Sequence, residues 1–73
     1  MTVAALGEHD VIVGYGLAGV RLLPADGAGD VLRAWDSLPA GTTLLLVSTA
    51  AREVLDDLLA ARRLVWLELT DER

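Results

Sequence analysis

Short apolar runs alternate along the chain with segments in which apolar residues recur at helical spacing. The runs predict four strands, at residues 2–6, 20–23, 42–47 and 64–69. The intervening segments predict three helices, over residues 10–18, 30–38 and 49–63. The residues suited to cap these helices, because their side-chain oxygens can accept hydrogen bonds from free N–H groups, are Asp10, Asp30 and either Ser48 or Thr49. The predicted element order is therefore β-α-β-α-β-α-β.

Strands that alternate with helices through short connections predict a parallel sheet with helices on both faces. Residues 42–47 are apolar on both faces, as in a strand buried between two helical layers. Right-handed crossovers favour the flavodoxin-like strand order 2-1-3-4. We therefore predict a single α/β domain over residues 1–73, with a four-stranded parallel sheet and three helices.

This topology leaves part of one sheet face uncovered. The first helix lies alone on its face, so alternate residues of 44–47 and 64–69 on that face meet water. Which residues these are is left open, because a one-residue slip in register exchanges the two faces. Trp66 is equally suited to core packing and to partner binding, whereas Trp35 is expected in the core. Since large apolar patches are rarely left open, we expect another chain there, either a partner or a second copy.

Composition excludes several function classes. Six arginines against eleven acidic side chains give a net charge of −5, whereas nucleic-acid binding needs a basic surface. The chain has no cysteine, no lysine and one histidine, His9, which excludes thiolate metal sites, Schiff bases and P-loops. No apolar run approaches the ~20 residues that span a bilayer, and the N-terminus does not look like a secretory signal. We therefore expect a cytoplasmic protein that does not insert in a membrane.

Residues 14–19, Gly-Tyr-Gly-Leu-Ala-Gly, match the G-x-G-x-x-G motif that holds a pyrophosphate between a strand and a helix. In that interpretation residues 10–13 form the strand, and the segment resembles the nicotinamide-binding domains that regulate potassium channels. Residues 2–6 would then be an unexplained strand, and Pro24 would end the following helix after about one turn. No acidic residue is placed to hold the ribose. A truncated dinucleotide-binding regulatory domain is thus the alternative function.

Other catalytic patterns are incomplete. Glu8 and Asp10 follow the first strand as the acidic pair of a response-regulator receiver does, but the phospho-accepting aspartate and the lysine are missing. A helix-capping role for Asp10 and a surface position for Glu8 are favoured. Ser48 and Thr49 lack the glycines of a nucleophile elbow, so a cap is again favoured. We expect no catalytic, cofactor-binding or metal site.

Residues 7–20, Gly-Glu-His-Asp-Val-Ile-Val-Gly-Tyr-Gly-Leu-Ala-Gly-Val, resemble the N-terminal signature of the F subunit of V-type and archaeal A-type ATPases. That family has a first strand, a Gly-acidic turn, an aspartate at the helix start and then Gly-aromatic-x-Leu-Ala-Gly-Val. The matching positions are Gly7, Asp10, Gly14, Tyr15, Leu17, Ala18 and Gly19. The remainder of the chain resembles the family more loosely. In this interpretation Gly14 lets the first helix pack closely on the sheet and Gly19 ends it.

The resemblance implies a non-catalytic component of the central stalk of a rotary ATPase. The F subunit binds the D subunit and helps couple ATP hydrolysis or synthesis to proton or sodium transport, so it is peripheral to the membrane. The family continues past the fourth strand to a C-terminal helix, whereas this sequence stops at residues 70–73, Thr-Asp-Glu-Arg. Functions that the C-terminal helix carries are therefore not implied for this chain.

Overall fold

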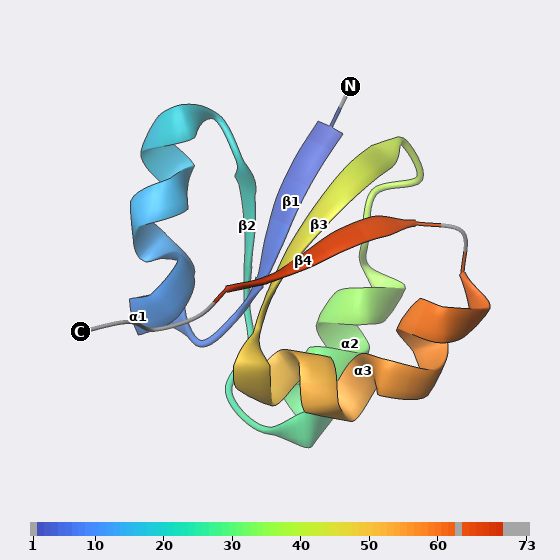
Figure 1. Ribbon diagram of the computed structural model, residues 1–73. Helices are drawn as coiled ribbons and strands as arrows, with labels where there is room; N and C mark the ends of the chain where they lie inside the picture. Colours follow the sequence, from blue (N-terminus) through green and yellow to red (C-terminus); the bar gives the residue numbers. More distant parts are fainter. Residues whose placement is uncertain (1, 63, 70–73) are drawn as a thin grey trace.

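The computed structural model describes residues 2–62 and 64–69. In chain order the elements are β1 (Thr2–Gly7), α1 (His9–Ile12), the 3-10 helix η1 (Val13–Ala18), β2 (Arg21–Pro24), α2 (Ala28–Asp36), β3 (Thr42–Ser48), α3 (Thr49–Ala61) and β4 (Val65–Leu69). The strands form one parallel sheet in the order β2-β1-β3-β4. In Figure 1, α1 and η1 lie on one side of the sheet, and α2 and α3 lie on the other. The predicted flavodoxin-like α/β fold is confirmed.

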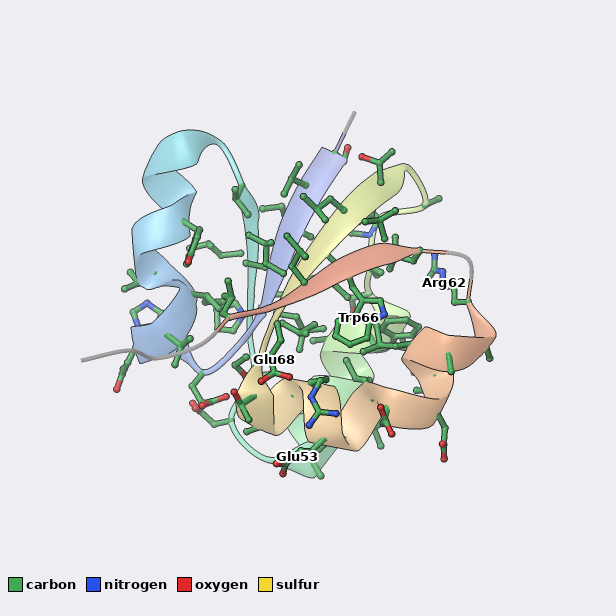
Figure 2. The ribbon with its side chains drawn as sticks, in the orientation of Figure 1. Glu53, Arg62, Trp66 and Glu68 are labelled. Carbon is green, nitrogen blue, oxygen red and sulfur yellow. The ribbon has the colours of Figure 1, made fainter. Side chains whose placement is uncertain are left out.

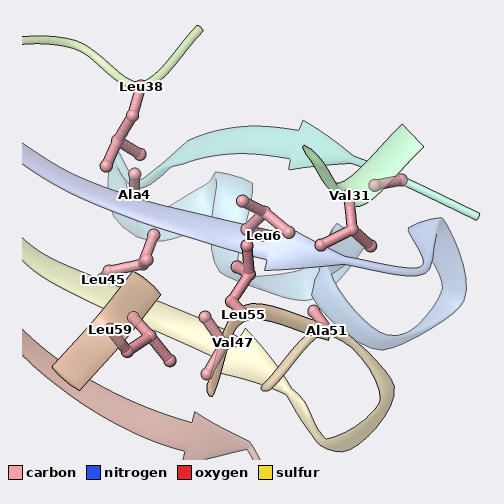
Figure 3. Close-up of a cluster of buried hydrophobic side chains, with 10 residues drawn as sticks. Ala4, Leu6, Val31, Leu38, Leu45, Val47, Ala51, Leu55 and Leu59 are labelled. Carbon is pink, nitrogen blue, oxygen red and sulfur yellow. The ribbon is translucent and has the colours of Figure 1, made fainter. Parts of the chain in front are cut away.

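The sheet separates two apolar clusters of unequal size. Side chains alternate along a strand, so Ala4 and Leu6 of β1 face α2 and α3, whereas Ala5 faces α1. The larger cluster fills the space between the sheet, α2 and α3 (Figure 3), and its buried members are Ala4, Leu6, Ala25, Val31, Leu38, Leu45, Val47, Ala51, Leu55 and Leu59. The buried members of the smaller cluster are Ala5, Ile12 and Leu46. The two-sided burial of β3 is the pattern expected of a strand between two layers.

The first two helices begin before the residues predicted to cap them. The N-cap of α1 is Glu8, so Asp10 lies inside the first turn and is exposed. The N-cap of α2 is Gly27, and Asp30 lies in its first turn, where it forms an ion pair with Arg33. Both capping predictions were therefore wrong. The carboxylates of Asp10 and Asp30 still lie in the first turn, where the helix dipole favours a negative charge. An acidic residue at the start of a helical segment therefore fits a first-turn position as well as a cap.

The segment over residues 10–18 is helical, as predicted, but it is not one α-helix. A single α-helical turn, α1, continues into η1, and Gly19 ends η1 in the left-handed conformation at φ 80°. Glycine adopts this conformation without a steric penalty, so the predicted stop at Gly19 is confirmed. The role predicted for Gly14 was wrong, because it is exposed and an added Cβ there would meet nothing within 4 Å. The glycine that approaches the sheet is Gly16, where a Cβ would lie 3.1 Å from Leu22 Cδ1 in β2.

The third helix begins where the sequence places it. Ser48 is its N-cap, and the Ser48 hydroxyl accepts a hydrogen bond from the N–H of Ala51 at 3.2 Å. Among the apolar residues at helical spacing in this helix, Leu55 and Leu59 are buried, whereas Leu58 is 37% exposed. The helix ends at Ala61, so Arg62 is the residue after it, and Arg63 lies outside the described residues.

Candidate functional site

The carboxyl ends of β1 and β3 meet at the centre of the sheet, which is where open α/β sheets commonly bind ligands. Gly7 ends β1 there, and Ser48 ends β3. The buried Ser48 hydroxyl donates a hydrogen bond to Glu8 Oε1 at 2.7 Å while it accepts the capping bond from α3. The predicted surface role of Glu8 was therefore incomplete, since this carboxylate joins the start of α1 to the start of α3.

Close packing leaves little room for a ligand at this point. A Cβ on Gly7 would lie 2.6 Å from Ser48 Oγ and 2.7 Å from Ser48 Cβ, so the two chain segments already touch. A phosphate would also meet the Glu8 carboxylate, which repels anions. The arrangement connects the starts of α1 and α3 to the sheet.

Replacing Ser48 with alanine should lower the free energy of unfolding by about 1–2 kcal/mol, because α3 loses its N-cap and Glu8 loses its donor. Urea denaturation measures the change. Thr49→Ala is the matched control, since the Thr49 hydroxyl is exposed and donates only to Glu68. An equal loss in the two variants would contradict the capping role of Ser48.

A second polar cluster joins α3 to β4. Glu68 accepts a hydrogen bond from Thr49 Oγ1 at 3.0 Å, and it forms an ion pair with Arg52, with Nε 2.5 Å from Oε1. Arg52 is partly buried against β4. The signal for this pair was the one carboxylate in the apolar run Val-Trp-Leu-Glu-Leu. A charge on the covered side of a strand needs an opposite charge from the element above it.

Trp66 lies on the covered side of β4. It pairs with Leu45 in the sheet and packs partly buried against the larger cluster, between β4 and the two helices (Figure 2). Trp66 therefore does not lie on the uncovered face. Of its two predicted roles, core packing and partner binding, the structure places it in the first. Trp35 also packs against the larger cluster, as expected, and the Arg62 guanidinium carbon lies 5.3 Å from the centre of its ring, which is cation–π distance.

The glycines of residues 14–19 do not form a nucleotide-binding turn. Val11 and Ile12 are α-helical, and Gly14 and Gly16 lie within η1. A dinucleotide motif needs a strand before the first glycine and a helix after the second. Tyr15 is exposed, whereas the side chains of Leu17 and Ala18 lie outside what the structure describes.

The most prominent surface feature is an apolar area on the α1 face of the sheet. Because Trp66 and Glu68 face α3, Val65 and Leu67 point to the opposite face, where β4 carries no helix in the described part of the chain. Val65 is 66% exposed and Leu67 is 56% exposed, and Leu44 of the neighbouring β3 is partly exposed. We call Leu44, Val65 and Leu67 the bare strip. Its position confirms the predicted gap beside the first helix.

The bare strip is uncharged as well as apolar. Its register neighbours on the same face, Leu46 and Leu69, belong to the smaller cluster around Ile12, so the strip is continuous with that cluster. None of the described residues that β3 and β4 present on this face carries a charge. Such a surface can bury apolar area against another protein chain without desolvating a charge.

Clustered metal ligands and long apolar helices are both missing from the part of the chain that the structure describes. Within residues 2–62 and 64–69, histidine and acidic side chains do not gather in groups of three or more that could hold a metal ion. Nor does any helix in that range have the length and apolar character to cross a membrane.

Comparison with known proteins adds no family assignment. No family model matches this sequence, and no curated protein matches it. What stands is the fold class, a flavodoxin-like α/β domain whose exposed apolar surface lies beside its first helix.

Proposed function

We propose that this chain is a non-catalytic protein-binding module that acts as the F subunit in the central stalk of a V/A-type rotary ATPase. The observation that carries the proposal is the bare strip of Leu44, Val65 and Leu67, an uncharged apolar surface beside α1. Surfaces of this kind mark protein–protein contacts, and the three side chains of the strip offer no polar group to orient a small polar substrate.

The partner proposed for the strip is the D subunit of the stalk, a coiled coil. A helix is about 10 Å across, and two strands of a sheet are together about 10 Å wide, so one helix of a coiled coil covers β3 and β4. The choice of this partner rests on the resemblance of residues 7–20 to the signature of the F subunit. In this role the protein helps couple ATP hydrolysis or synthesis to proton or sodium transport, and it is peripheral to the membrane through the complex.

Co-purification with the D subunit from the same organism tests the proposal. We expect a stable complex in size-exclusion chromatography with light scattering, and we expect Leu67→Asp to abolish it, because the aspartate would be buried against the partner. Leu32→Asp is the matched control, since Leu32 is an exposed leucine of α2 on the opposite side of the sheet. Absence of a complex with the unmodified chain would contradict the stalk role.

Calorimetric titration with NADH or ATP serves as the second arm of this test. The helical conformation of residues 11–16 offers no phosphate-binding turn, so no heat of binding is expected. A dissociation constant in the micromolar range would instead support the dinucleotide-binding alternative.

A further inference from the structure

On the face of the sheet that carries α1 and η1, helices cover about half of the sheet in the described part of the chain. On this face α1 contributes Val11 and Ile12 to the smaller cluster, which also includes Val20 and Leu22 at the β2 side of the sheet. The strands β3 and β4 beside them carry the bare strip. The open half is about 10 Å wide, which is two strand spacings, and β4 is about 16 Å long for its five residues. A single short helix would fill it.

The chain itself presents a helix of these dimensions. The four residues of α1 and the six of η1 together extend about 18 Å, at 1.5 and 2.0 Å per residue. This helical segment carries exposed apolar side chains, since Val13 is 46% exposed and Tyr15 is 39% exposed. The six residues of η1 include no charged side chain. Gly14 is also exposed, and an added Cβ there would meet nothing within 4 Å, so another backbone can approach η1 closely at this residue.

We infer that two copies of this chain associate reciprocally, each placing its η1 over the bare strip of the other. In this arrangement the two sheets face each other, and a two-fold axis runs between them along the strand direction. The α1 and η1 helices of the two copies then lie side by side in one layer between the sheets. Each copy then contributes two surfaces, the strip and the helix, so every contact occurs twice, as in an isologous interface. Stable pairs bury about 800 Å² per copy, and in this arrangement two separate contacts on each copy contribute to the buried area.

The strip and η1 are both uncharged, which fits a second copy as the occupant, whereas the net charge of the two copies opposes their association. Each copy has a net charge of −5, so the copies repel each other at a distance. Neither the strip nor η1 contributes a charge to the proposed contact, so no charge is buried when they meet. Added salt should therefore strengthen this association, because it screens the repulsion, whereas salt would weaken the binding of a basic helix.

Sedimentation equilibrium of the purified full chain, without any partner, tests the inference. We expect a monomer–dimer equilibrium whose dissociation constant falls as salt rises from 50 to 500 mM. Leu67→Asp on the strip and Tyr15→Asp on η1 should each weaken the dimer at least tenfold. The control Leu32→Asp should leave it within twofold. A monomer at all concentrations, an equal effect of Leu32→Asp, or no effect of Tyr15→Asp would overturn the inference.

Mixing the two weakened variants separates reciprocal docking from simple pairing of β4 edges. In a mixed dimer the intact η1 of Leu67→Asp meets the intact strip of Tyr15→Asp, so one of the two contacts is fully restored. Mixing should therefore recover dimer that neither variant forms alone, and no recovery would overturn the reciprocal arrangement.

Leu67→Thr, which keeps a strand-forming residue, is a second strip variant, and circular dichroism confirms that each variant is folded. The strip cannot hold η1 of a second copy and a helix of the stalk partner at the same time, so the dimer proposed here is that of the chain free of the stalk partner. These measurements omit that partner, so they can fail or succeed independently of the stalk role.

Discussion

Shortening Leu55 to alanine should lower the free energy of unfolding by about 2–5 kcal/mol, the range for a buried leucine that leaves a cavity. Leu55 is fully buried where α3 packs on β1 and β3, and it belongs to the larger cluster. A chain of 73 residues has a total stability of about 4–11 kcal/mol, so this substitution removes a large part of it. Urea denaturation of the purified protein measures the loss.

Leu58→Ala is the matched control for Leu55→Ala. It removes the same atoms from the same helix, but Leu58 is partly exposed, so the expected loss is below about 1.5 kcal/mol. Similar losses in the two variants would show that α3 does not present Leu55 to the sheet.

Gly7→Ala should destabilise the protein by about 2–3 kcal/mol, because the added methyl group overpacks the junction of β1 and β3. Ser48 is held there by its bonds to Glu8 and to the N–H of Ala51, so it cannot turn away from the methyl group without breaking one of them. A shift in the midpoint of thermal unfolding gives the effect.

Gly14→Ala should change the midpoint of thermal unfolding in the opposite direction from Gly7→Ala. The position is helical and open, so alanine should stabilise the protein by about 0.5–1 kcal/mol through its lower conformational entropy when unfolded. If Gly14→Ala were the destabilising change and Gly7→Ala neutral, the assignment of close packing to Gly7 would be wrong.

The order of the strands could be predicted because several signals in the sequence agree. Four apolar runs separated by helical periods, short connections and the right-handed crossover rule leave few topologies. The open half of the α1 face followed from that topology before any side chain was placed. The helix end at Gly19 was also predictable, and the cap of α3 was predicted to within one residue, at Ser48 or Thr49, since each has a residue type with a specific local role.

Side-chain direction was harder to predict than topology. In the run Val-Trp-Leu-Glu-Leu of β4, both faces carry large apolar residues, so the sequence alone does not say whether Trp66 or Leu67 is covered. The structure decides it through contacts between distant residues, where Glu68 meets Arg52 and Thr49. The predicted caps Asp10 and Asp30 lie two and three residues after the actual N-caps for a related reason, since an acidic residue suits both the cap and the first turn of a helix.

The position of β1 also determines when the fold can form during synthesis. β1 is made first, yet it lies between its two neighbours in the sheet, and its register with β3 joins Thr2 to Thr42. A ribosome that adds about 5–20 residues per second needs about 2–8 s to extend the chain from Thr2 to Thr42. During that time the apolar β1 has at most β2 beside it. Because parallel pairing of distant segments is slow, assembly of the sheet waits for β3 to leave the ribosome.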